Sequence, residues 1–152
     1  MFTLDSRLQQ DTVFIGRLPL CQMLLMNDSR YPWVILVPTR VDAREYYHLS
    51  VEDQTQMMRE SAWVAEKLAD QYSAKSMNVA ALGNVVAQLH VHHVVRKGDD
   101  PAWPGPVWGH SPAVAYTDAE LEQRVHELKG LFSSHFVEDI DGSDDVENNI
   151  YW

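Results

Sequence analysis

The first third of the chain carries two long apolar segments, LPLCQMLLM at residues 18–26 and WVILVPTR at residues 33–40. Residues 27–32 between them contain Asn, Asp, Ser and Pro, which together predict a turn. The run Val34–Val37 is apolar without alternation, which indicates an interior strand covered on both faces, and Pro38 would end its hydrogen-bond ladder. The pattern therefore predicts a pair of antiparallel strands.

Two later segments have the periodicity of amphipathic helices. Ser50 begins a capping box with Asp in place of Glu, and apolar positions then recur at spacings of three and four, which predicts a helix over residues 51–72. Those positions are Met58, Ala62, Ala65, Ala69 and Tyr72. The sequence TDAE at residues 117–120 is a second capping box, and an apolar stripe after it predicts a helix that ends near Gly130 or just beyond it. The stripe consists of Leu121, Val125, Leu128 and Phe132.

Strand-like segments also lie between the two helices. Met77–Leu82 and Val85–Val95 are separated by Gly83-Asn84, which predicts a hairpin. Four of the seven prolines fall within residues 97–112, which predicts a long, stiff loop. Strands that come early and in the middle, with helices between and after them and no regular βαβ alternation, predict an α+β fold with an antiparallel sheet.

The segment QLHVHHVVR at residues 88–96 holds three of the seven histidines within four positions. Because side chains alternate across a strand, these residues divide between two faces. One face carries Gln88, His90, His92, Val94 and Arg96, and the other carries Leu89, Val91, His93 and Val95. The first face is poorly suited to a core, so His90 and His92 are the candidate functional residues. The second face is apolar apart from His93, which favours a structural role for that histidine.

Three interpretations of the pair formed by His90 and His92 stay open from the residues alone. Imidazoles two positions apart on a strand can both bind zinc, but the other ligands would have to come from His110, Asp99 or Asp100 in the proline-rich loop. The two rings can also be hydrogen-bonded parts of a sheet without a chemical role. In the third interpretation, one neutral imidazole attacks a phosphorus atom and forms a phosphoramidate that water later cleaves, while neighbouring groups hydrogen-bond the phosphoryl oxygens.

These residues resemble the histidine triad (HIT) superfamily of nucleotide hydrolases and transferases, whose motif is His-φ-His-φ-His-φ-φ with φ apolar. WVILVP followed by the helix from Ser50 is similar to the family's strand and long helix, and residues 78–96 are similar to the hairpin that carries the motif. Together with Trp103 and Trp108, they resemble an uncharacterised bacterial HIT-like subgroup. The resemblance implies a HIT-like α+β fold with an antiparallel sheet of about five strands and two main helices.

The resemblance also implies an activity. The family's nucleophile is the middle histidine, which this comparison places at His92, with His90 in the first position. The third position then falls on Val94, so the triad is incomplete. The implied function is a nucleotide phosphohydrolase or nucleotidyltransferase that acts on a nucleotide or dinucleoside polyphosphate through a nucleotidyl intermediate on His92, as a homodimer and without a metal or other cofactor. Because Val94 and Val41 stand where the family has histidines, a nucleotide-binding protein without turnover is the alternative.

That mechanism assigns roles to the surrounding residues. One ring nitrogen of His92 must be unprotonated to attack while the other donates to a backbone carbonyl, and His90 would orient or bind phosphate. Asn84 and Gln88 are neutral amides suited to hydrogen-bonding the charge that develops on nonbridging oxygens, and Arg96 would neutralise a second phosphate. Each of these three residues also has a structural interpretation, in which Asn84 closes the turn, Gln88 bridges backbone groups and Arg96 ends the strand.

Composition limits the partners. Twelve Lys and Arg against 22 Asp and Glu give a net charge of −10, which argues against a nucleic-acid-binding protein with a broad cationic face and disfavours anionic membranes. No apolar run approaches the roughly 20 residues that cross a bilayer, and the first residues lack the features of a signal peptide. We therefore expect a cytoplasmic protein. The lone Cys21 lies in an apolar stretch, which predicts a buried, unreactive thiol.

The length of 152 residues corresponds to one domain, which we place at residues 1–137. Residues 138–152 form an acidic tail with six acids and no base before its last three residues, which are apolar. Such a tail is expected to be mobile or docked on the body or on a second subunit. Trp103 and Trp108, held between prolines, are expected to form an aromatic wall that packs against the protein, a nucleobase or a partner subunit.

Overall fold

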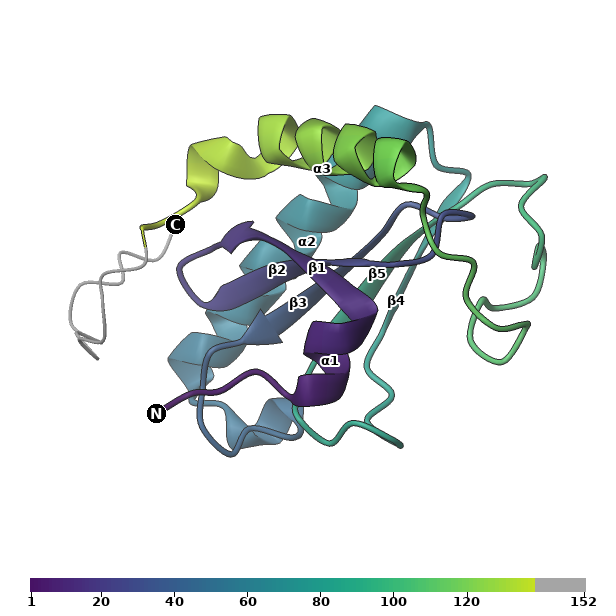
Figure 1. The fold of residues 1–152 in the computed structure, drawn as a ribbon. Coiled ribbons are helices and arrows are strands. Elements are labelled where there is room, and N and C mark those ends of the chain that lie inside the picture. Colours follow the sequence, from purple (N-terminus) through teal and green to yellow (C-terminus); the bar gives the residue numbers. More distant parts are fainter. Residues whose placement is uncertain (139–152) are drawn as a thin grey trace.

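The protein folds around one antiparallel sheet with the strand order β1-β2-β3-β5-β4. The computed structural model describes residues 1–138, so the expectations for the tail beyond Glu138 lie outside the described residues. The strands are β1 (Thr12–Arg17), β2 (Cys21–Met26), β3 (Trp33–Pro38), β4 (Ser76–Ala80) and β5 (Val91–Arg96). Figure 1 shows the sheet with the long helix running behind it. The predicted α+β class with a five-stranded antiparallel sheet is confirmed.

Two main helices accompany the sheet, as predicted. The helices are α1 (Ser6–Asp11), α2 (Val51–Tyr72) and α3 (Asp118–Phe132), with short 3-10 turns η1 (Tyr46–His48) and η2 (Ser133–His135). The side chain of Ser50 accepts a hydrogen bond from the Asp53 backbone N–H at the start of α2, and Thr117 and Glu120 form the predicted capping box of α3. Among the described residues, no helix combines the length and the apolar character needed to span a membrane.

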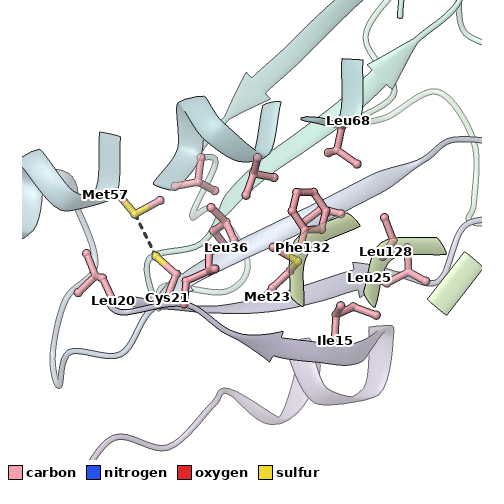
Figure 2. Close-up of a cluster of buried hydrophobic side chains, with 14 of the residues drawn as sticks. Ile15, Leu20, Cys21, Met23, Leu25, Leu36, Met57, Leu68, Leu128 and Phe132 are labelled. Carbon is pink, nitrogen blue, oxygen red and sulfur yellow. Dashed lines mark hydrogen bonds between the residues drawn. The ribbon is translucent and has the colours of Figure 1, made fainter. Parts of the chain in front are cut away.

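The main hydrophobic core lies between the sheet and the helices α2 and α3. Figure 2 shows side chains from both helices meeting those of the strands, with Leu68, Leu128 and Phe132 on the helical side. Cys21 is fully buried in this core, 3.3 Å from the Met57 sulfur, and burial raises the pKa of its thiol well above the ordinary value. The predicted burial of this thiol is thus confirmed, and its raised pKa favours the unreactive form.

β3 is the interior strand that its continuous apolar run predicts. All six of its residues are buried, because its two neighbours β2 and β5 cover its edges and both faces contact side chains. The last paired position with β2 joins Cys21 to Pro38, so the ladder ends at the proline as expected. The segment before β2 differs from the prediction, because residues 18–20 turn and β2 begins only at Cys21.

The predicted pairing of the two strands is confirmed, but the tight turn at Gly83-Asn84 is wrong. β4 and β5 do pair, from Ser76 with Arg96 to Ala80 with His92, but residues 81–90 form the connection between them. The backbone of this connection is bound to distant parts of the chain: Leu89 N–H donates to the Ala43 carbonyl at 2.9 Å. Contacts of this kind replace the strand ladder that the apolar pattern of residues 85–90 suggested.

The buried face of α2 is also different from the predicted stripe. Met58 is 64% exposed, and the buried residues are Asp53, Gln56, Met57, Glu60, Ser61, Val64 and Leu68. The polar residues on this face are hydrogen-bonded, Ser61 to His93, Asp53 to Arg40 and Gln56 to Glu60. Glu60 also accepts hydrogen bonds at 3.0 Å from the backbone N–H groups of Leu20 and Cys21. Burial raises the pKa of its carboxyl group.

A second hydrophobic cluster covers the opposite face of the sheet. It contains Leu8 of α1, the side chains of Trp33, Ile35 and Val94 from the sheet, and Val107 from the loop after β5. The partly buried residues Phe2, Leu4, Val86 and Trp108 pack around it. The N-terminal segment and the loops 81–90 and 97–117 therefore surround the face of β5 that carries the candidate histidines.

Candidate functional site

His90 and His92 lie side by side on the face of the sheet opposite α2. His92 is in β5, where it is paired with Ile35 of β3, and His90 directly precedes the strand. Their ring centroids are 5.0 Å apart, and each residue is 7% exposed. The alternation predicted for residues 88–96 thus holds, and it presents two imidazoles together at one edge of the second cluster.

The hydrogen bond of His90 determines which of its nitrogens is available. Nδ1 lies 2.7 Å from the backbone carbonyl oxygen of Gln88. Because a carbonyl only accepts, Nδ1 carries the proton and donates it to this bond. In the neutral ring, Nε2 then has a free lone pair. His90 therefore has the tautomer that nucleophilic attack requires.

His92 has the opposite arrangement. Its Nδ1 lies 2.9 Å from Trp33 Nε1, and an indole N–H only donates, so Nδ1 is the acceptor and is unprotonated. Burial, with smaller effects from His90 and His93, lowers the pKa of His92 to about 3, so the ring is neutral at pH 7. Its single proton is therefore on Nε2, and His92 presents a hydrogen-bond donor to the site.

Aromatic rings enclose His92. Trp33 is 5.6 Å and Trp108 is 5.5 Å from its ring centroid, and the two indoles contact each other edge to face at 6.1 Å. Trp108 therefore lies at the candidate site, where it was expected as part of a wall. Trp103 lies elsewhere, under the guanidinium of Arg96 at 5.6 Å.

His93 faces the helices. Its Nδ1 lies 3.3 Å from the Val34 carbonyl oxygen and its Nε2 lies 2.7 Å from Ser61 Oγ, so the ring bridges β3 and α2. The residue is fully buried, and burial lowers its pKa to about 4. His93 therefore lies in the core, on the face of the sheet opposite to His90 and His92.

Titration of His93 should make the protein less stable in acid. Its pKa in the folded state is about 4, below the ordinary 6.5, so the unfolded chain takes up a proton first as the pH falls. The stabilisation is complete above pH 6.5 and is lost towards pH 4. We expect His93 to lower the free energy of unfolding by on the order of 3 kcal/mol over this interval. Urea unfolding from pH 7 to pH 4 measures the loss, and His93→Gln should flatten the curve; an unchanged pH dependence in the variant would contradict the assignment.

The guanidinium of Arg96 is engaged within the chain, and its role in phosphate binding stays a prediction. Its guanidinium is buried and donates to both carboxylate oxygens of Asp100, at 2.8 and 3.0 Å, to Asn78 Oδ1 at 2.7 Å and to the Gly105 carbonyl at 2.7 Å. Burial opposes ionisation of Asp100, but the bonds from Arg96 and from nearby backbone N–H groups outweigh it and lower the pKa of that carboxyl. Arg96 thereby fixes the loop after β5.

Gln88 bridges backbone groups, as its structural interpretation expects, and its role in phosphate binding stays a prediction. Its side-chain amide accepts from the Asp5 backbone N–H and donates to the Thr3 carbonyl, both at 2.9 Å, so it ties the N-terminal segment to the loop before β5. Each end of the amide makes one of these bonds, and one N–H of the amide has no bond among them. Asn84 lies exposed in the loop 81–90, and its role in phosphate binding stays a prediction.

Trp33 is the site residue that the sequence interpretation missed. The register between β3 and β5 identifies it. Trp33 is paired with Val94, so it is a diagonal neighbour of His92 on the same face of the sheet. For the metal interpretation, no group of three or more His, Cys, Asp or Glu side chains within residues 1–138 is placed to hold a metal ion.

The family model of the HIT domain matches residues 7–99. The chain is 47% identical to a histidine triad protein from Marinobacter aquaeolei VT8, with a TM-score of 0.86 over 89% of this chain and 98% of that one. It is 47% identical to a histidine triad (HIT) protein from Sinorhizobium meliloti 1021, with a TM-score of 0.80 over 84% and 96% of the two chains. A histidine triad protein from Bradyrhizobium japonicum is 39% identical, with a TM-score of 0.82 over 90% and 98%. A comparison with curated proteins finds no match.

Proposed function

Because the chain belongs to the histidine triad (HIT) family, we propose that it is a nucleotide phosphohydrolase or nucleotidyltransferase that acts through a covalent nucleotidyl intermediate on His90. The substrate is a nucleotide or a dinucleoside polyphosphate. The observation that carries the proposal is the hydrogen bond from His90 Nδ1 to the Gln88 carbonyl oxygen, because it leaves the Nε2 lone pair free to attack.

The proposal moves the nucleophile from His92 to His90, and the family motif supports the change. Read from Gln88 to Val94, the chain gives Gln-Leu-His-Val-His-His-Val, which places His90 in the middle position and His92 in the third. The replaced histidine is then the first one, where Gln88 stands, and its backbone carbonyl is the group that orients His90. In this register Val94 no longer occupies a triad position.

The two rings divide the chemistry between them. The Nε2 lone pair of His90 forms a bond to phosphorus, and the P–O bond to the leaving group breaks with its electron pair on that oxygen. The proton stays on Nδ1, hydrogen-bonded to the Gln88 carbonyl, while the ring becomes cationic. Water then cleaves the P–N bond and restores the neutral ring. His92 Nε2–H donates to a nonbridging oxygen, where charge develops in the transition state.

One observation favours a second candidate, a nucleotide-binding protein without turnover. Both histidines are only 7% exposed, so a phosphate group reaches them only if the surrounding side chains move. The N-terminal segment that Gln88 holds and the loop that carries Trp108 are the nearest such parts. Binding without a covalent adduct is the outcome that this candidate predicts.

The homodimer is also part of the proposal. β4 is an edge strand that pairs only with β5 in the described sheet. Apolar side chains are exposed on this strand and in the loop after it, with Val79 at 48% and Leu82 at 44%. An edge strand with exposed apolar neighbours supports a second copy there.

Trapping tests the covalent step. The protein is incubated with a dinucleoside polyphosphate labelled in the adenosine, quenched, and analysed for protein-bound adenylyl label. We expect label on the wild type and on His110→Ala, an exposed control histidine, and none on His90→Ala. Label that persists in His90→Ala and is lost in His92→Ala would return the nucleophile to His92. Nucleotide binding without label on the wild type would support the protein without turnover.

A further inference from the structure

We propose that Trp33 is a positioning residue that keeps the single proton of His92 on Nε2, so that His92 serves the site as a neutral hydrogen-bond donor. Only the part in which His92 donates to a phosphate group rests on the proposed function. The arrangement itself concerns two side chains whose atoms lie 2.9 Å apart, Trp33 Nε1 and His92 Nδ1.

Only one tautomer of His92 is compatible with its contact with Trp33. An indole nitrogen has a hydrogen and no lone pair in the ring plane, so it donates and never accepts. A proton on His92 Nδ1 would point at the Trp33 N–H and remove the hydrogen bond of both groups. Both residues are nearly buried, Trp33 at 6% and His92 at 7% exposure, so water does not readily replace the lost bond.

The sheet fixes the two rings in place. Trp33 begins β3 and is paired with Val94, while His92 is paired with Ile35, so the backbone sets the indole diagonally across from the imidazole. Tyr31 and Trp108 each contact the Trp33 ring edge to face, with centroids at 6.3 and 6.1 Å. These contacts keep the indole N–H directed at His92.

The consequence is a difference between the two neighbouring histidines. His90 Nδ1–H donates a hydrogen bond to a carbonyl and leaves a free lone pair at Nε2, whereas His92 Nδ1 accepts a hydrogen bond and Nε2 carries the hydrogen. The ionisable groups that act on His92 are His90, 5.0 Å away on the same face, and His93, which faces α2. Trp33 adds to their effect, because a second proton on His92 has to go to the nitrogen that the indole occupies.

Nuclear magnetic resonance tests the arrangement without any need for turnover. In uniformly ¹⁵N-labelled wild-type protein, we expect a scalar coupling across the N–H···N bond between Trp33 Nε1 and His92 Nδ1, and a directly bonded proton on His92 Nε2. A wild-type protein without the coupling, or with the proton on Nδ1, would overturn the proposal. This measurement requires no variant, so it does not depend on the folding of one.

Trp33→Phe removes the N–H and keeps an aromatic ring. We expect His92 to become protonated at a higher pH in this variant than in the wild type, because its Nδ1 then has no donor in place and can take up a second proton. The ¹⁵N shifts of the ring nitrogens across a pH titration measure the change. Trp108→Phe is the matched control, since Trp108 also contacts the His92 ring but does not donate to it, and it should titrate as the wild type.

The outcomes separate the two proposals. If Trp33→Phe and the wild type show the same His92 titration, the positioning role is wrong, whatever the activity. If the coupling and the changed titration are found but the wild type forms no adenylyl adduct, the positioning role stands and the covalent mechanism fails. If Trp108→Phe changes the titration as much as Trp33→Phe, the effect comes from aromatic packing and the proposal is wrong.

Discussion

His90→Gly is expected to lower kcat for a dinucleoside polyphosphate by about 10³-fold or more, and added imidazole is expected to restore part of the lost rate. The variant lacks the lone pair that attacks phosphorus, but it leaves a space beside the Gln88 carbonyl that a free imidazole can enter. Such a molecule can donate its N–H to that carbonyl as His90 does. Initial rates with increasing imidazole measure the effect.

His92→Gly is the comparison for this experiment. It removes a hydrogen-bond donor, for which a loss of about 10²- to 10³-fold in kcat is expected, while the covalent adduct still forms on His90. Turnover by His90→Gly at close to the wild-type rate would contradict the proposed nucleophile. Stronger rescue of His92→Gly than of His90→Gly by imidazole would point to the reverse assignment of the two rings.

Asp100→Ala is expected to lower the free energy of unfolding by about 3–5 kcal/mol, because it leaves the charge of Arg96 buried without its partner. The Asp100 carboxylate accepts both bonds from Arg96 and three more from the backbone N–H groups of Lys97, Ala102 and Trp103. Urea or guanidinium unfolding at pH 7 measures the change.

The neighbouring residue supplies the control for this prediction. Asp99 is an exposed carboxylate in the same loop, so Asp99→Ala should change the free energy of unfolding by less than about 0.5 kcal/mol. Because the same loop brings Trp108 to His92, Asp100→Ala should also alter tryptophan fluorescence before the global transition. Equal stability of the two variants would show that the network of Arg96 contributes little.

Local sequence patterns predicted an element correctly where the residues that determine it lie close together in the sequence. The start of α2 follows from the cap at Ser50, the capping box at Thr117 marks α3, and the continuous apolar run identifies β3 as an interior strand. The alternation of side chains along β5 likewise separates His90 and His92 from His93 correctly. In these cases the sequence spacing itself is the physical cause of the arrangement.

The sequence could not supply what depends on distant partners. The buried face of α2 contains Glu60 because its acceptors meet backbone groups about forty residues away, at Leu20 and Cys21, and no local pattern contains that information. The roles of the two histidines likewise depend on what each Nδ1 meets: for His90 a carbonyl two residues before it, and for His92 an indole 59 residues away. Neither contact changes the hydrophobic pattern.

β5 is joined to a strand on each side, to β3 and to β4. The two histidines therefore sit on, or directly beside, the part of the sheet that has the least freedom to shift. By contrast, residues 81–87 and 97–117, which lie around the histidines, contain no helix or strand. Under the proposed function, changes in the length and composition of these two loops would alter substrate preference while the two imidazoles keep their spacing, and exchanging the loops with those of a relative would test this.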